Sequence, residues 1–208
     1  MPFSDQTIQQ FLDELASPSP APGGGATAAL AGSLAAALVS MVCRLTIGLK
    51  NYENVSPELE TLLGRAEDRR RVLLQLMEAD AAAYDAVIAT YKLPKELEEE
   101  KVARQVAIQD ALKHAAEVPF QIVGACADVL DLVLPVAAKG NKNAASDAGS
   151  AALLADAGLR GALLNVEINL GLIKDEQYVQ EMRVRLEPFI RGRSEQKEAI
   201  FQLVQSRL

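Results

Sequence analysis

Hydrophobic positions recur with a helical period along most of the chain. The first apolar stripe, at positions 8, 11, 12 and 15, follows Ser4, a residue type suited to an N-cap, and predicts a short amphipathic helix. Prolines and glycines then dominate residues 17–25. Because proline interrupts a helix and glycine permits positive φ, this stretch is expected to be a loop.

Residues 26–43 carry no charge, and small residues recur there at every fourth position. This stripe consists of Gly24, Ala28, Gly32, Ala36 and Ser40. The length alone would allow a membrane span, but the segment is rich in alanine and only weakly hydrophobic. We therefore favour a central helix buried on all sides, whose small stripe lets a neighbouring backbone of the same subunit or of a partner approach closely.

Two longer helical stretches follow. Ser56 and Pro57 form an N-cap and N1 pair that opens a helix running to about Tyr91. Residues 92–95 interrupt the pattern, and a charged helix follows. We expect Pro119 to stop or kink that helix, with a separate apolar helix continuing to residue 138.

A polar loop at residues 139–145 separates these helices from the last third of the chain. Ser146 or Asp147 is expected to cap a further helix, rich in small residues, that extends to about Ile173.

The C-terminal residues 174–208 predict one or two amphipathic helices, with Asp175 and Ser194 as caps. No segment alternates as a strand does, and no repeat of fixed period occurs. The expected fold is an all-α helical bundle with long, buried central helices rich in small residues, forming one domain over residues 1–208.

Composition narrows the classes of function. The 208 residues suffice to bury a hydrophobic core, and the net charge of -7 argues against a nucleic-acid-binding surface. The first 16 residues do not resemble a secretory signal, so we expect a cytoplasmic protein that does not act at a membrane.

Metal binding is not expected from the residues available. The chain has a single histidine, and its two cysteines, Cys43 and Cys126, are far apart within apolar segments. No spacing typical of a zinc or redox motif occurs, so both cysteines are predicted to be free core thiols.

Asp80 is the residue that the apolar pattern singles out. It stands three residues after Met77 and four before Tyr84, so it shares their helical face. Burial raises the pKa of a carboxyl group and suits it to acid–base catalysis. The alternative is a structural ion pair in the core with Arg44 or Arg70.

The glycines before the central helix, Gly23, Gly24 and Gly25, form a second candidate site. Consecutive glycines at a helix N-terminus expose amide N–H groups that suit an anion or the polar edge of a ligand. The same glycines would also serve a turn that merely lets two helices pack together.

Polar side chains gather on and before the predicted helix that extends to about Ile173. They are Asn141, Asn143, Ser146, Asp147, Asn165 and Asn169. Amides both donate and accept hydrogen bonds and so suit a heterocycle that carries both kinds of group. They can equally cap and bridge helices without a ligand.

Six strings occur between residues 20 and 170, and the resemblance that they carry covers most of residues 4–176, in order. They are PAPGGGATAA at 20–29, MVCRLTIG at 41–48, DAAAY at 80–84, LPK at 93–95, GNKNAASD at 140–147 and RGALLNVEINL at 160–170. Together they resemble the family of formiminotetrahydrofolate cyclodeaminases and methenyltetrahydrofolate cyclohydrolases.

The resemblance implies an all-helical homodimer that binds a tetrahydrofolate derivative and uses no metal. It assigns acid–base catalysis to Asp80 and places the glycine loop and residues 141–147 in the folate pocket. Lysines are candidates to meet the glutamate carboxylates of a substrate that can be polyglutamylated. They are Lys50, Lys92, Lys95 and Lys142, of which Lys95 lies in a matched string. Leu49 and Asn51 stand where relatives often carry basic residues.

Two sister reactions fit this resemblance. A cyclodeaminase converts 5-formiminotetrahydrofolate to 5,10-methenyltetrahydrofolate and ammonia, and a cyclohydrolase adds water to the methenyl compound to give 10-formyltetrahydrofolate. The sequence ranks the first only slightly ahead. The alternative from another class is a non-catalytic helical protein that oligomerises through the small-residue stripe, with Asp80 as a core ion-pair partner.

Overall fold

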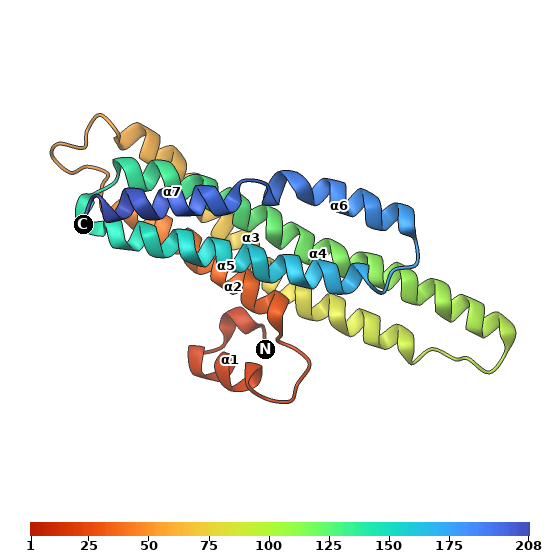
Figure 1. Cartoon of the computed structure of the whole chain (residues 1–208). Helices are drawn as coiled ribbons and strands as arrows, with labels where there is room; N and C mark the ends of the chain where they lie inside the picture. The colour runs from red at the N-terminus through yellow and green to blue at the C-terminus, as the bar shows by residue number, and fades with distance from the viewer.

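Four long helices run along the molecule in the computed structural model, which describes residues 1–208 (Figure 1). They are α2 (Gly24–Arg44), α3 (Ser56–Tyr91), α4 (Glu98–Lys139) and α5 (Ala145–Leu170). Helix α2 packs against α3 and α5, and α4 packs against the same two helices, which closes an up-and-down bundle. The predicted all-α helical bundle is confirmed.

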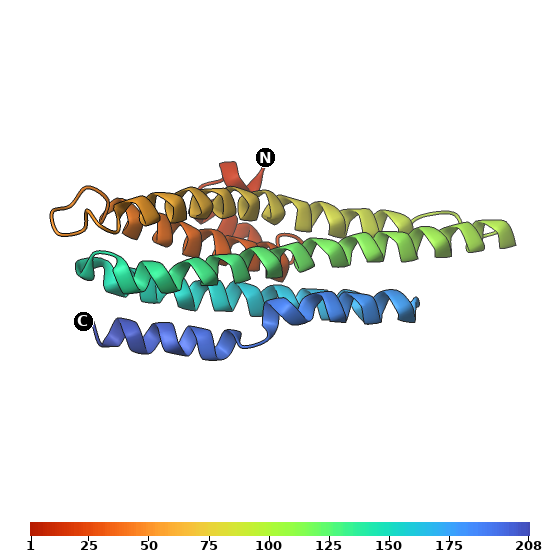
Figure 2. The ribbon, with the colours of Figure 1, turned by 90° about the horizontal axis from the view of Figure 1, so that it is seen from above.

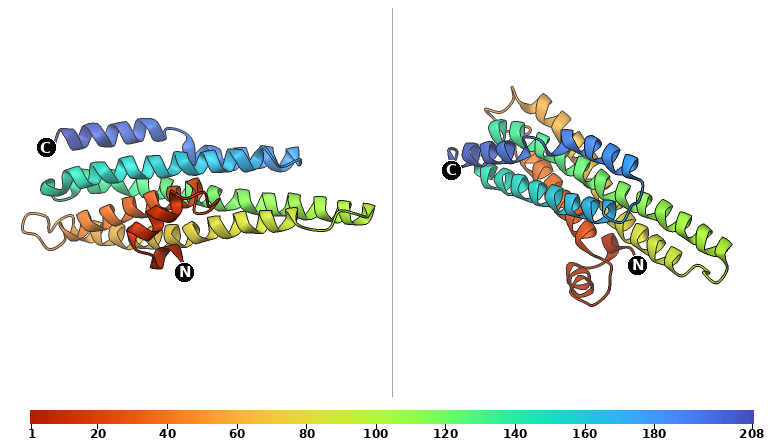
Figure 3. Two further views of the ribbon diagram at one scale, coloured as in Figure 1. Left: turned by 90° about the horizontal axis from the view of Figure 1, so that it is seen from below. Right: turned by 45° about the vertical axis from the view of Figure 1, so that its right-hand side comes forward.

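Shorter elements flank this bundle. They are η1 (Phe3–Asp5), α1 (Ile8–Leu15), η2 (Lys142–Ala144), α6 (Glu176–Ile190) and α7 (Arg193–Gln205). Helices α6 and α7 form an outer layer beside α4 and α5 (Figure 2). The segment containing η1 and α1 stands away from that layer, and η1 contacts α3 (Figure 3).

The small-residue stripe of α2 is used inside the subunit. A Cβ atom added at Gly32 would lie 2.5 Å from Sγ of Cys126 on α4, and one added at Gly158 on α5 would lie 2.7 Å from the carbonyl oxygen of Ala28. Helices α2, α4 and α5 therefore pack closely together at these small residues. Burial is incomplete, however, because Leu34 on the opposite stripe of α2 is 49% exposed.

Two helices, α2 and α4, are apolar enough over 18 residues to cross a membrane by length and composition alone. In each of them 61% of that window is buried inside the bundle. Both free cysteines, Cys43 and Cys126, also lie fully buried there, as predicted. Packing in the protein core accounts for the apolar composition of these helices.

Helix α4 continues through Pro119, so the expected separation into two helices is wrong. A proline inside a helix leaves the carbonyl four residues earlier without its usual N–H donor. That carbonyl belongs to Ala115, and the side chain Nδ2 of Asn169 donates to it at 3.2 Å. Helix α5 thus supplies the missing hydrogen bond at this point of α4.

The N-terminal helix and the long third helix begin close to their predicted starts. Thr7, not Ser4, is the N-cap of α1, and its hydroxyl forms a capping box with Gln10. Ser56 and Pro57 lie in the first turn of α3, one position later than expected, and α3 ends at Tyr91 as predicted.

Of the caps predicted later in the chain, Asp175 is confirmed, whereas Ser146, Asp147 and Ser194 do not cap a helix. Asp175 caps α6 by accepting a hydrogen bond from the backbone of Tyr178. Neither Ser146 nor Asp147 caps α5, because η2 leads directly into that helix. Ser194 lies inside α7, where its hydroxyl accepts a hydrogen bond from Arg160 instead.

Candidate active site

A cavity of about 380 Å³ opens where α2 begins. The hairpin of α3 and α4 extends well beyond that point (Figure 1), so only three of the four long helices continue and the place of the fourth is left empty. The loop before α2 forms one side of the cavity. Its lining consists of Pro20, Ala21, Gly23, Gly24, Gly25, Asp80, Ala81, Ala83, Tyr84, Val87, Ile88, Tyr91, Leu112, Ala115, Asn165, Ile168, Asn169 and Leu172.

Asp80 is the only ionisable carboxylate in this lining, and it lies directly against the backbone of Gly25. A Cβ atom added at Gly25 would fall well under 3.0 Å from all three carboxyl atoms, closer than real Cβ atoms come. Burial raises the pKa of Asp80, and the nearby backbone N–H of Ala26 offsets part of that rise. The site therefore holds a partly desolvated carboxylate at the positive end of a helix.

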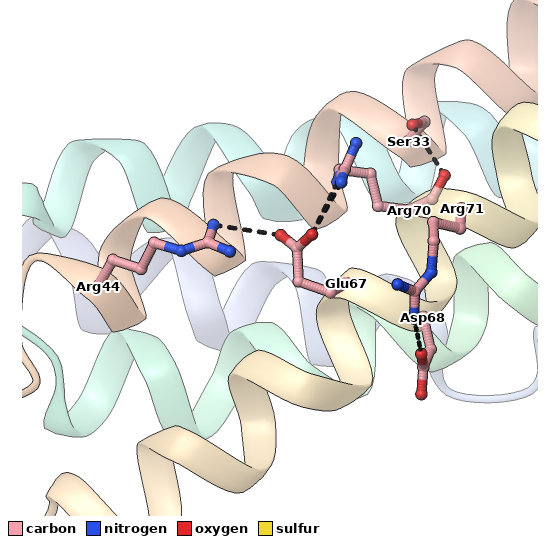
Figure 4. Close-up of polar contacts among 6 residues, drawn as sticks. All are labelled: Ser33, Arg44, Glu67, Asp68, Arg70 and Arg71. Carbon is pink, nitrogen blue, oxygen red and sulfur yellow. Dashed lines mark hydrogen bonds and ion pairs between the residues drawn. The ribbon is translucent and has the colours of Figure 1, made fainter.

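Neither arginine proposed as an ion-pair partner reaches Asp80. Figure 4 shows both of them directed at Glu67, with Arg44 at 3.2 Å and Arg70 at 2.8 Å. The backbone of Arg70 also accepts a hydrogen bond from Ser33. Asp80 forms no salt bridge at all, so the alternative of a structural core ion pair is not what the structure contains.

The two asparagines of α5 face the same cavity with their amide nitrogens already occupied. Asn165 donates to the carbonyl of Gly161 at 2.8 Å, and Asn169 donates to the carbonyls of Ala115 and Asn165. Gly24 packs closely on Asn165, since an added Cβ would lie 3.2 Å from its Nδ2. Each Oδ1 remains as an acceptor without a donor from the chain, which suits the N–H groups of a heterocycle.

The second predicted loop lies at the other end of the bundle. Asn141 donates to the carbonyl of Leu45 and accepts from the backbone of Asn143, while Thr46 accepts from the backbone of Asn141. These contacts fasten the loop to the C-terminus of α2, about 30 Å along that helix from Gly25. Within one chain, Asn141, Asn143, Ser146 and Asp147 are therefore not brought together with Asp80, and their role in binding remains a prediction.

Lys95 also lies outside the cavity lining, exposed in the connection between α3 and α4. The apolar walls that the sequence did not assign to the site include Tyr84 and Tyr91. Tyr84 and Tyr91 follow Asp80 by four and eleven residues, so they share the helical face of Asp80. This spacing was the sequence signal that could have assigned them to the site.

A second hollow of about 510 Å³ lies on the other side of the loop before α2. Thr27 and Ser19 are the only residues with polar side chains in its lining, so it contains no group able to transfer a proton near neutral pH. The structure also brings together no group of three or more His, Cys, Asp or Glu side chains that could hold a metal ion.

Comparison with known proteins agrees with this assignment. The sequence profile of the family described as formiminotransferase-cyclodeaminase matches residues 7–188. The chain belongs to this family.

The chain is similar in sequence to relatives with two different named activities. It is 46% identical over 204 residues to a methenyltetrahydrofolate cyclohydrolase of Methylorubrum extorquens, and the match covers 98% of each chain. It is 30% identical over 203 residues to the formimidoyltransferase-cyclodeaminase of Rattus norvegicus, of whose length the match covers only 38%.

The fold of this family member is shared by a solved structure. The crystal structure of formiminotetrahydrofolate cyclodeaminase from Thermotoga maritima aligns with a TM-score of 0.82 and 35% sequence identity, covering 99% of this chain and 96% of that one. The protein is therefore an all-helical enzyme of folate one-carbon metabolism, with either cyclodeaminase or cyclohydrolase activity.

Proposed function

We propose that the protein is a methenyltetrahydrofolate cyclohydrolase in which Asp80 is the catalytic acid–base group. The observation that carries this proposal is the unpaired carboxylate of Asp80, held in a largely apolar cavity against Gly25. The choice between the sister reactions is supported by the end-to-end match to the cyclohydrolase of Methylorubrum extorquens. This reverses the slight preference for cyclodeamination that the sequence strings gave.

The reaction begins with a cation, in which one carbon bridges N5 and N10 of the reduced folate. The carboxylate of Asp80 lies near that carbon, stabilises the positive charge and orients a water molecule toward it. As the water oxygen bonds to the carbon, Asp80 accepts one of the water protons. A neutral adduct with a hydroxyl group on the bridging carbon results.

Collapse of this adduct gives the product. The bond from the carbon to N5 breaks while the hydroxyl group loses its proton and becomes the formyl carbonyl on N10. Asp80, now protonated, delivers its proton to N5. Of the two protons of the water, one remains on N5 and the other goes to solvent, so Asp80 returns to its ionised form.

Cyclodeamination is the second candidate, because the solved structure with the same fold is named for that activity. There N10 attacks the carbon of the protonated formimino group, and Asp80 accepts the proton of N10. Asp80 then passes that proton to the resulting amino group, which leaves as neutral ammonia while the methenyl cation forms. One carboxylate positioned beside the bridging carbon serves both reactions, so the two differ in substrate and not in the group that moves the proton.

We further propose that the enzyme acts without a metal and as a homodimer, as the resemblance implies, and that it works in the cytoplasm. Exposed apolar side chains support the homodimer. On α5, Leu164 is 72% and Ile168 is 69% exposed, and Ile168 also lines the cavity. A contact between two copies that covered these residues would adjoin the active site, and light scattering in solution measures the expected doubled mass.

The test of Asp80 is the substitution Asp80→Asn, followed through the near-ultraviolet absorbance of the methenyl group. The amide keeps the shape of the side chain but cannot accept a proton, so turnover should fall by roughly 100-fold or more. Asp85→Asn removes an exposed carboxylate from the same helix and should leave turnover unchanged. Supplying the formimino compound in parallel shows which sister reaction the enzyme catalyses.

Stability and pH separate a catalytic role from a structural one. A raised pKa means that ionised Asp80 costs folding free energy above that pKa, so Asp80→Asn should melt no lower than the wild type at pH 7. Wild-type turnover should decline as the pH falls through the raised pKa, because protonated Asp80 cannot accept a proton. Equal turnover in Asp80→Asn and wild type, or a loss explained by unfolding, contradicts the proposal.

A further inference from the structure

The N-terminal segment beside the active-site cavity carries no basic side chain. Residues 1–43 contain no lysine, arginine or histidine, although three acidic residues occur there. The loop before α2, which forms one end of the cavity, therefore offers no side chain to balance a negative charge. A ligand with a carboxylate tail is favoured with that tail directed away from this loop.

The opposite end of the cavity is formed by Tyr91, the last residue of α3. The guanidinium of Arg104 lies over its ring, 5.8 Å from the ring centroid, and donates to its backbone carbonyl at 3.1 Å. Arg104 belongs to α4, three turns before Ala115, which also lines the cavity. Because eleven residues bring a helix back to nearly the same face, Arg104 extends this wall beyond Tyr91.

Arg104 is held in place but its charge is unused. Only one of its donors has a partner in the chain, its Nε is buried with no hydrogen-bond partner, and no carboxylate pairs with it. The neighbouring acids have other contacts, since Glu98 pairs with Lys101 and Glu100 accepts from the backbone at the start of α4. A planar guanidinium with free donors matches a carboxylate in two-point contact.

The dimensions agree with this role. Asp80 and Tyr91 are separated by eleven residues of α3, or about 16 Å along the helix axis. In the proposed reaction, the bridging carbon lies beside Asp80, and the aminobenzoyl ring and glutamate extend from N10. That part of the substrate, in an extended conformation, follows the apolar side chains of α3 toward Arg104.

We propose that Arg104 binds the glutamate carboxylate of the folate substrate and sets the direction in which the substrate lies. This inference rests on the proposed function, because it assigns one end of the substrate of that same site. Tyr91 positions the guanidinium through its ring and carbonyl, and the carboxylate takes the donors that the chain leaves free. Additional glutamates of a polyglutamylated substrate would continue toward the exposed Lys92 and Lys95.

The experiment compares two substrates in the wild type and in Arg104→Ala. One substrate is 5,10-methenyltetrahydrofolate, and the other is the corresponding tetrahydropteroate, which lacks the glutamate. Loss of a hydrogen-bonded charge contact should raise KM for the folate by about ten- to a hundredfold while kcat changes little. KM for the pteroate should be the same in both proteins.

Two variants serve as controls. Lys101→Ala removes a positive charge one turn away on α4 that is already paired with Glu98, and it should leave KM for both substrates unchanged. Arg104→Lys keeps the charge but loses the planar fork, and it should give an intermediate KM for the folate alone. If Arg104→Ala does not fold, the Arg104→Lys variant makes the same comparison.

The outcomes distinguish this inference from the proposed function. An equal loss with both substrates would show that Arg104 only supports the end of α3, and it would overturn the inference while leaving the proposed function intact. Unchanged KM for the folate in both Arg104 variants would overturn it as well. Wild-type protein that converts neither methenyl substrate refutes the proposed cyclohydrolase activity and this inference with it.

Discussion

Gly25→Ala is the substitution that most directly tests the geometry of the active site. The added methyl group would overlap the carboxyl group of Asp80, since every carboxyl atom lies well under 3.0 Å from the ideal Cβ position. The carboxyl group must therefore withdraw by about 1 Å, and a displacement of that size at a reacting group costs on the order of 100-fold in rate. The catalytic residue itself is unchanged in this variant.

The effect on stability follows from two opposing contributions. Alanine is favoured over glycine in a helix by up to about 1 kcal/mol, whereas overpacking in a close contact costs about 1–3 kcal/mol. We expect Gly25→Ala to lower the free energy of unfolding by about 1–2 kcal/mol in the wild-type background. In an Asp80→Ala background the overlap disappears, and the same change should be neutral or stabilising.

The assay is a double-mutant cycle of the two substitutions, measured by urea unfolding and by methenyl turnover. Gly64→Ala, at a helical glycine with no atom within 4 Å of the added Cβ, controls for the change of residue type. The expected coupling between Gly25→Ala and Asp80→Ala is about 2 kcal/mol in stability. Additive stabilities, or a Gly25→Ala enzyme with full turnover, would refute the proposed contact between the backbone of Gly25 and the carboxylate.

Two further predictions concern the bundle itself. Gly158→Ala would place a Cβ 2.7 Å from the carbonyl oxygen of Ala28 and should lower the free energy of unfolding by about 1–3 kcal/mol, whereas Gly64→Ala should raise it slightly, both measured by urea titration. The hydrogen bond from Arg70 lowers the pKa of Glu67 to about 2, so the stability of the wild type over Glu67→Gln should persist at neutral pH and disappear as the pH falls from about 4.5 to 2 in thermal melts. A difference in melting temperature that does not change over this range contradicts the second prediction.

Much of the fold could be predicted because it depends on local sequence patterns. The end of α3 at Tyr91 and the cap at Asp175 are both set by residues adjacent in the sequence. Pro119 could not be interpreted in the same way, because the group that compensates it is the side chain of Asn169, fifty residues later. A helix break predicted from a proline is wrong when tertiary contacts supply the missing hydrogen bond.

In the candidate site, too, residues with a local sequence signal could be predicted, whereas residues whose role depends on tertiary packing could not. Asp80 could be found because a carboxylate on an apolar helical face is conspicuous, and Gly25 because it lies in a run of glycines. Arg104 could not be found, since a single arginine in a charged helix has no local signal of its use. Asn141 was grouped with the site by resemblance, and only the arrangement of the helices shows that it lies at the far end of the same chain.

The cavity exists because one member of the four-helix bundle is shorter than its neighbours. Its depth is thus governed by the residue at which α2 starts, and each residue added to or removed from that start alters the available length by about 1.5 Å. The close packing at Gly32 and Gly158 lies further along and is not disturbed by such a change. Substrate size and structural integrity are in this way governed by separate stretches of a single helix.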